Sequence, residues 1–114
     1  MLLQSDFSLI RGIPFHQLVL AEENVRKVYS ETAILELSIL IKARGGVIQN
    51  LVVYEVEKPR KRGVKQFAVM AGGRRWRALS HLLKEGEISR DYIVPCKVMS
   101  KAAAIAIRDR KSVV

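Results

Sequence analysis

Short runs of strand-forming residues alternate with amphipathic stretches along this chain of 114 residues, and this alternation limits most strongly the folds that it can adopt. The pattern predicts a first strand or extended segment at 13–20, a polar connection at 21–29, and later strands at 47–56, 66–71 and 91–99. A basic turn joins the second and third runs, which predicts a hairpin. Because helical stretches separate the other runs, the order predicts one α+β domain with a small mixed β-sheet packed with helices.

Capping and breaking residues mark the limits of these elements. Ser30 and Ser100 are suitable N-caps for the first and last helices, and the glycine pair at 45–46 would end the first helix. Pro95 removes a backbone donor from the strand at 91–99. We therefore expect that strand to lie at a sheet edge or to contain an irregular segment.

The stretch MAGGRRWRALSHLLKEGEI at 70–88 places two glycines and then three arginines at the start of a predicted helix. A helix start carries partial positive charge and unpaired N–H groups, so acidic residues are favoured there. An anionic ligand would explain the arginines, because the glycines allow close approach to the backbone and guanidinium groups bind phosphate. The alternative is a solvated helix face beside a buried Trp76, and the sequence of a Walker A loop is absent.

Charge and cysteine content narrow the classes of function. The 20 Lys and Arg residues against 11 Asp and Glu give a net charge of +9, which suggests a nucleic acid, a nucleotide or an anionic membrane as partner. The single cysteine, Cys96, is expected to be a buried thiol in a reducing cytoplasm. His16 and His81 have no cluster of ligands around them in the sequence, so no metal site is expected. We also expect neither a signal peptide nor a transmembrane helix.

The glycine–arginine motif and four other segments resemble one protein family. AGGRRWRAL resembles the GERRWRA box of ParB-type partition proteins. Further segments resemble the family in the same order and spacing: ENVRKVY, ILELSILIKARGGVIQNLVV, YIVPCKVM and KAAAIAI. The resemblance implies an N-terminal domain of the ParB/sulfiredoxin-like fold at 13–107, preceded by an arm at 1–12 and followed by a tail at 108–114 that departs from the family pattern.

The resemblance also implies a function in plasmid or chromosome segregation. Proteins of this family bind centromere-like DNA, act with a partition ATPase, and use an N-terminal switch in which CTP and Mg²⁺ bring N-domains together. Carried over by motif, the phosphates would lie at Gly72, Gly73, Arg74 and Arg75. The nucleoside side would be formed by Asn24, Arg26, Gly46, Val47, Ile48 and Gln49. Such a protein is expected in the cytoplasm, on the nucleoid or a plasmid, with no membrane partner.

A second group of cations could contact DNA phosphates. It consists of Lys58, Arg60, Lys61, Arg62 and Lys65 in the basic turn, with Arg77 on the outer face of the arginine-bearing helix. The alternative for the turn is a simple solvated loop. The expected helix-turn-helix and dimerisation domains are not in this chain, so its DNA binding should be non-specific and salt dependent. A fragment, a truncated gene product and a stand-alone relative all fit the sequence.

Three departures from the family pattern concern turnover. Gly73 stands where the family has Glu, Asn50 stands where it has Pro, and 108–114 lacks the EN-x-x-R motif expected after the last helix. A guanidinium cannot accept a proton from water. We therefore expect nucleotide binding with little or no hydrolysis, and we assign no catalytic residue.

Other functions on this fold fit the residues less well. Sulfiredoxin-like redox chemistry needs a cysteine in the phosphate-binding turn, where this chain has Gly73 and Arg74. A free-serine kinase would need carboxylates near the nucleotide, for which Glu22 and Glu23 are the candidates. The main alternative is a stand-alone basic module that binds DNA or protein without nucleotide switching.

Overall fold

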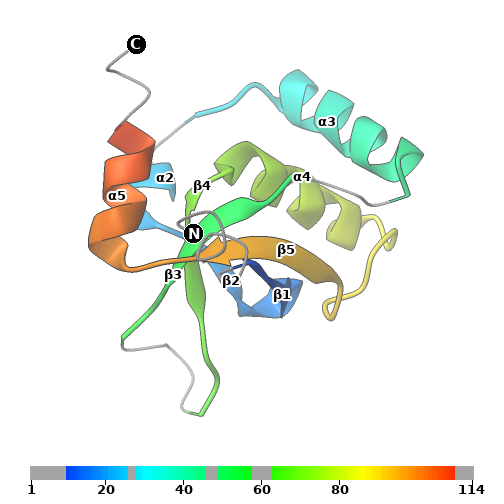
Figure 1. Cartoon of the computed structure of the whole chain (residues 1–114). Coiled ribbons are helices and arrows are strands. Elements are labelled where there is room, and N and C mark those ends of the chain that lie inside the picture. Colours follow the sequence, from blue (N-terminus) through cyan, green and yellow to red (C-terminus); the bar gives the residue numbers. More distant parts are fainter. Residues whose placement is uncertain (1–9, 26–27, 46–48, 58–62, 110–114) are drawn as a thin grey trace.

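The computed structural model describes residues 10–25, 28–45, 49–57 and 63–109, and these form a mixed sheet flanked by helices (Figure 1). The sheet has five strands in the order β1-β5-β3-β4-β2. Their bounds are β1 Ile10–Pro14, β2 Leu18–Leu20, β3 Leu51–Glu55, β4 Phe67–Ala71 and β5 Ile93–Val98. The helices are η1 Phe15–Gln17, α2 Glu22–Val25, α3 Glu31–Ala43, α4 Gly73–Lys84 and α5 Lys101–Asp109.

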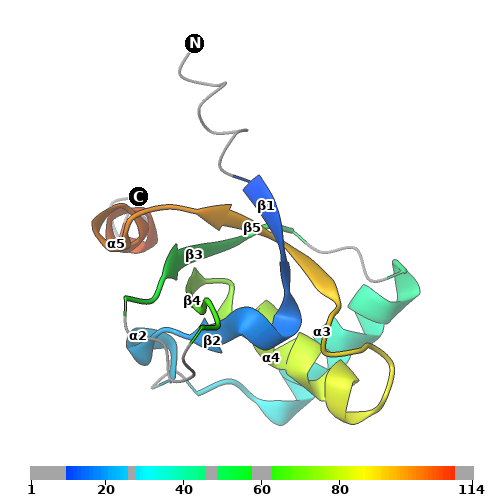
Figure 2. The same ribbon diagram turned by 90° about the horizontal axis from the view of Figure 1, so that it is seen from below.

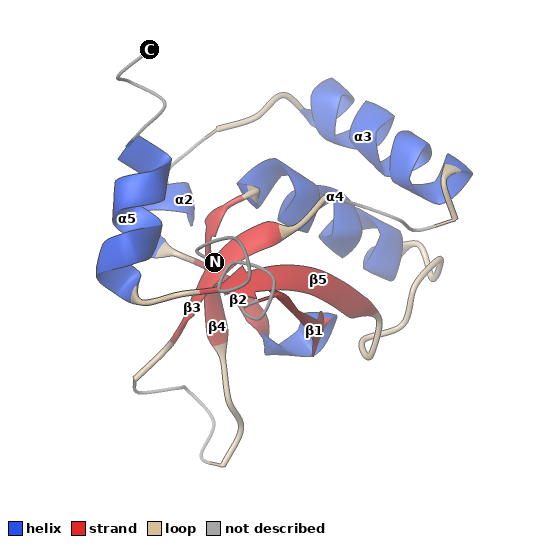
Figure 3. Cartoon of the chain, in the orientation of Figure 1, coloured by secondary structure: helices blue, strands red, loops and turns tan. Residues whose placement is uncertain are grey.

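Parallel and antiparallel pairs alternate across the sheet (Figure 3). β1 is antiparallel to β5, and β3 is antiparallel to β4, as the predicted hairpin requires. β3 is parallel to β5, and β2 is parallel to β4. The prediction of an α+β domain with a mixed sheet is therefore confirmed.

The segment at 13–20 is not one strand, which corrects the sequence-based prediction. β1 and β2 lie at opposite edges of the sheet, although only the three residues of η1 separate them. The Phe15 and His16 N–H groups donate to the carbonyls of Tyr92 and Arg90 at 2.8 and 3.0 Å, which fixes this turn. Because so short a connection joins the two edges, the sheet must curl until they approach each other (Figure 2).

Helices cover two sides of the curled sheet. α4 buries Ala78, Leu79 and Leu82 in the main core, which also contains Phe67 and Val94, while α3 packs mainly on α4. α5 covers a second, smaller core on β3 and β4, away from α3 and α4 (Figures 1 and 2). Within the described part of the chain, no helix has both the length and the apolar character needed to cross a membrane.

The predicted helix caps are confirmed. Ser30 Oγ accepts from the Ala33 N–H at 3.1 Å at the start of α3, and Ser100 Oγ accepts from the Ala103 N–H at 3.2 Å before α5. The connection predicted at 21–29 differs from the expectation, because it contains the short helix α2 with a buried Asn24. Local sequence therefore predicted the caps correctly but missed a turn of helix that long-range contacts stabilise.

Pro95 lies in an interior strand, so the expected edge position is wrong. β5 is flanked by β1 and β3. The register nevertheless shows how a proline is accommodated: Pro95 lies opposite Gly12 of β1, whereas the pairing with β3 begins one residue later, at Cys96. At Pro95 itself the strand therefore has a partner on one side only, which leaves room for a residue without an N–H.

Candidate functional site

The two glycines before α4 form a tight junction with the end of β4. Gly72 is the N-cap and has a left-handed backbone conformation with φ of 100°. A Cβ atom at this position would lie 2.5 Å from Leu51 Cδ2. Gly73 begins the helix and is buried, and a Cβ atom there would lie 3.3 Å from Asn24 Cγ. Gly72 is therefore favoured both by its backbone conformation and by close packing, whereas a side chain at Gly73 would need only a small shift of Asn24.

The side chain of Asn24 holds the end of β4 in place next to this junction. Its side-chain Nδ2 donates to the carbonyls of Val69 at 2.6 Å and Met70 at 2.9 Å, which lie near the end of β4, just before the glycines. Asn24 is 2% exposed. A side-chain amide has two N–H donors, and both are used here. The structure thus places this residue, predicted on the nucleoside side, beneath Gly73 as a support for the backbone.

Two of the three arginines converge on one aromatic ring. The guanidinium carbons of Arg74 and Arg77 lie 5.7 and 5.6 Å from the ring centroid of Tyr29. Arg77 Nη2 also donates to the Asn24 carbonyl at 3.2 Å. Tyr29 was not predicted as a site residue. The signal for it was present, because an aromatic residue ends the ENVRKVY segment that carries the family resemblance.

The third arginine connects α4 to the segment that precedes β3. Arg75 Nη2 donates to Gln49 Oε1 at 2.5 Å. The structure thus brings together one residue predicted at the phosphates and one predicted on the nucleoside side. Four other predicted residues lie outside the described part of the chain: Arg26, Gly46, Val47 and Ile48.

The residues predicted to contact DNA are separated from this site, except for Arg77. Lys65 is exposed and lies ahead of β4. Lys58, Arg60, Lys61 and Arg62 lie outside the described residues. Arg77 is half-buried and contacts Tyr29 and Asn24 at the site itself.

The start of α4 has the chemistry of an anion site. Its first turn holds no acidic side chain. The Trp76 N–H donates to the Gly72 carbonyl at 3.0 Å, so the N–H groups of Gly73, Arg74 and Arg75 are those that a helix start leaves without an intrahelical partner. Arg74 and Arg75 belong to this first turn and Arg77 follows directly after it, and the helix dipole adds positive potential. Such an arrangement favours a ligand with several negative charges, such as a polyphosphate.

Trp76 belongs to the packing around this site. Its ring stacks on Phe15 with centroids 5.6 Å apart, and its Nε1 donates to the Leu18 carbonyl at 3.3 Å. On its outer side, a groove of about 510 Å³ runs between α4 and the segment that carries Tyr29, lined also by Ile34, Arg77 and Lys84. The predicted packing role of Trp76 is confirmed, although the residue is only half-buried.

Cys96 is a buried thiol, as predicted. It is fully buried on β5, and burial raises its pKa from 9.0 to about 12. The neutral thiol donates to the Val94 carbonyl at 3.4 Å. A thiol with so high a pKa is a poor nucleophile, and it lies on β5 rather than in the turn before α4.

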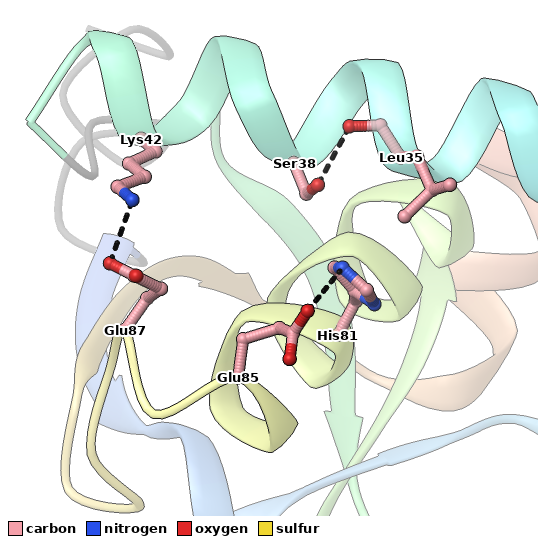
Figure 4. A network of polar contacts seen from close by, with 6 residues as sticks. All are labelled: Leu35, Ser38, Lys42, His81, Glu85 and Glu87. Carbon is pink, nitrogen blue, oxygen red and sulfur yellow. Dashed lines mark hydrogen bonds and ion pairs between the residues drawn. The ribbon is translucent and has the colours of Figure 1, made fainter.

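The opposite end of α4 carries a different group of polar residues (Figure 4). Lys42 Nζ of α3 pairs with Glu87 Oε2 at 3.0 Å, and His81 Nε2 lies 3.8 Å from Glu85 Oε1. Ser38 Oγ donates to the Leu35 carbonyl within α3 at 2.7 Å. Among the described residues, no three His, Cys, Asp or Glu side chains gather as a metal site, here or elsewhere. Of these contacts, the Lys42–Glu87 pair joins α3 to the segment that follows α4.

Comparison with known families identifies the class of this domain. A sequence model of the ParB N-terminal domain matches residues 3–108. The chain therefore belongs to the ParB N-terminal domain family.

Two relatives show how much of a longer protein this chain represents. The uncharacterized protein YubM of Escherichia coli (strain K12) is 37% identical over 96 residues, which are 83% of this chain and 14% of that protein. The nucleoid occlusion protein of Geobacillus thermodenitrificans (strain NG80-2) is 36% identical over 73 residues, which are 64% of this chain and 24% of that protein. The chain thus spans a small part of the length of both relatives.

Solved structures confirm the fold. A C-terminally truncated chromosome-partitioning protein ParB from Caulobacter crescentus, complexed with CTP-gamma-S, matches 91% of this chain and 52% of that chain with a TM-score of 0.65 and 26% identity. Its complex with the centromeric parS site matches 86% of this chain and 44% of that chain, with a TM-score of 0.54 and 24% identity. Sulfiredoxin from Arabidopsis thaliana matches 87% of this chain and 94% of that chain, with a TM-score of 0.52 and 18% identity. The last two comparisons show the fold alone, and together the three confirm the ParB/sulfiredoxin-like α+β class.

Proposed function

We propose that this domain binds a nucleoside triphosphate, with a preference for CTP, and acts as the nucleotide-dependent switch domain of a partition protein. The observation that carries the proposal is the start of α4, where Arg74, Arg75 and the N–H groups of the first helical turn lie together and that turn contains no acidic residue. The match to a ParB N-domain that holds CTP-gamma-S supports the choice of nucleotide.

The phosphates and the nucleoside would use different parts of the site. Arg74 and the N–H groups after Gly72 would bind the phosphates, because they lie at the positive end of the helix. Arg75 contacts Gln49, so it connects the phosphate side to the segment proposed for the nucleoside. Gln49 has both an amide donor and an amide acceptor, which suits recognition of a base edge or a ribose hydroxyl.

Magnesium would enter with the nucleotide rather than through a protein site. The start of α4 supplies guanidinium groups and backbone N–H groups, which are donors and not ligands for Mg²⁺. This fits a cation held mainly by phosphate oxygens and water. The described chain offers no carboxylate cluster that would hold it independently.

We further propose that nucleotide binding brings two N-domains together, in a protein that binds DNA and works with a partition ATPase in plasmid or chromosome segregation. Family membership supports this role. The match to the centromeric complex of the Caulobacter protein shows a similarity of fold only.

Calorimetric titration of the chain with CTP, ATP, GTP and UTP, each with Mg²⁺, tests the nucleotide proposal. We expect CTP to bind more tightly than the other three. An equal response to all four, or none, would contradict the switch and favour the basic DNA- or protein-binding module. Arg90→Ala is a suitable control, because it removes one exposed charge away from α4.

Hydrolysis requires a separate measurement. Gly73 leaves the family's Glu position without a carboxylate, so we expect binding with negligible release of phosphate. Phosphate release is measured with CTP, Mg²⁺ and DNA present. Sustained multiple turnover would show that another residue activates water.

A further inference from the structure

Tyr29 contacts two of the three arginines near the start of α4. It belongs to the segment between α2 and α3, next to Ser30, whose hydroxyl caps α3. Its half-buried ring faces Arg74 and Arg77, which are one turn apart on α4. The ring therefore connects the start of α3 to the start of α4.

The two arginines are held in different ways. Arg77 contacts the ring and also donates to the Asn24 carbonyl at 3.2 Å. Arg74 is exposed, and within the described part of the chain its contact is with the Tyr29 ring, at 5.7 Å from the centroid. A cation within about 6 Å of an aromatic face is attracted by the ring quadrupole. Tyr29 thus restrains an arginine that would otherwise move freely in solvent.

Such a restraint matters for an anion site. An exposed arginine loses side-chain entropy when it is fixed on a ligand, and a group that is already positioned loses less. This effect favours binding of a polyanion and is independent of the nucleoside attached to it.

We propose that Tyr29 is a positioning residue of the triphosphate site: its ring restrains the Arg74 guanidinium near the start of α4, where the phosphates would bind. This inference rests on the proposed nucleotide function. It adds that Tyr29 sets affinity for the phosphates and leaves the choice of base unchanged.

Binding of CTP, UTP and inorganic tripolyphosphate to four proteins tests this proposal. For Tyr29→Leu we expect all three ligands to bind about two- to fivefold more weakly by the same factor, as loss of an exposed cation–π contact requires. Tyr29→Phe keeps the ring and should bind like the wild type. Tyr54→Leu is the matched control, because Lys101 lies over that ring at 5.7 Å on the side of the sheet covered by α5. It should leave the affinities unchanged.

A double-mutant cycle distinguishes positioning from simple packing. In an Arg74→Ala background, Tyr29→Leu should cause no further loss of affinity, because the group that it positions is gone. Fully additive losses would overturn the proposal, as would a Tyr29→Phe variant that binds as weakly as Tyr29→Leu. A change in CTP preference without a change in tripolyphosphate affinity would also overturn it.

A measurement without ligand separates this inference from the function on which it rests. In NMR spectra of the wild type, we expect the side-chain Nε–H signals of Arg74 and Arg77 to be shifted by the ring, and the shift to disappear in Tyr29→Leu but persist in Tyr29→Phe. A wild type that binds none of the three ligands would refute the nucleotide function and this inference with it. A wild type that binds, with Tyr29→Leu binding equally well, would refute the role of Tyr29 alone.

Discussion

The two ends of α4 differ in how their charges are balanced. At the C-terminal end, His81 lies close to Glu85, and Glu87 just beyond the helix pairs with Lys42 of α3. At the N-terminal end, the first turn of α4 has no acidic residue, and the contacts of the arginines include an aromatic ring, a side-chain amide and a backbone carbonyl. Ion pairs within the molecule stabilise a fold, whereas a helix start that carries arginines and no acidic residue in its first turn attracts an anionic ligand.

The largest expected difference between the two ends of α4 is in how much a substitution of their glycines lowers the free energy of unfolding. Gly72 and Gly86 both have positive φ, of 100° and 73°, but a Cβ atom would meet Leu51 at 2.5 Å only at Gly72. Gly72→Ala should therefore lower the free energy of unfolding by about 2–4 kcal/mol, from backbone strain and overpacking together. Gly86→Ala, with nothing within 4 Å, should cost about 1 kcal/mol. Chemical denaturation measures both, and equal losses would show that the β4–α4 junction is looser than described.

Removing a cation from each end tests the difference in ligand binding. Arg75→Ala should weaken triphosphate binding by about 1.5–3 kcal/mol, or roughly tenfold to a hundredfold, through loss of a charge-assisted contact. Stability should change by less than about 0.5 kcal/mol, because the residue is partly solvent exposed. Lys84→Ala removes the same charge at the other end and should bind as the wild type does. If calorimetry showed equal losses of affinity for the two variants, the nucleotide would respond to the overall positive charge of the domain and not to a localised site.

An acid placed at the N-terminal end would make it resemble the C-terminal end. Gly73→Glu should lower the free energy of unfolding by about 1 kcal/mol, because its Cβ would press on Asn24. Its carboxylate should make nucleotide binding more dependent on Mg²⁺ without restoring sustained hydrolysis. Gly73→Ala adds the Cβ alone and serves as the control. Nucleotide affinity is measured by titration with and without Mg²⁺. An equal dependence on Mg²⁺ in the two variants would exclude an effect of the carboxylate.

The smallest effect is expected from the ion pair that holds α3 to the end of α4. Lys42 and Glu87 are both substantially exposed, with side chains 61% and 40% accessible. Glu87→Gln should therefore cost only about 0.2–1 kcal/mol, and the loss should diminish in high salt. Nucleotide affinity should not change. A fall in affinity would show that the two ends of α4 are coupled.

Sequence patterns gave a correct account of the elements that local chemistry decides. The caps at Ser30 and Ser100 follow from a hydroxyl that reaches the backbone three residues later, and the start of α4 follows from Gly72. The family resemblance added the fold, which the comparisons confirm. The glycine–arginine site was predicted from the same stretch, and its binding of nucleotide stays a prediction.

The rest was decided by contacts between residues far apart in the chain. The segment at 13–20 became two edge strands because Phe15 and His16 bond to the chain before β5. Asn24 is buried because its amide reaches carbonyls 45 and 46 residues away. Tyr29 acquired two arginine neighbours only when α4 packed beside the start of α3. Periodicity reports what each residue does within its own turn or strand, whereas the partner that a buried amide or a ring meets is fixed only when distant segments pack together.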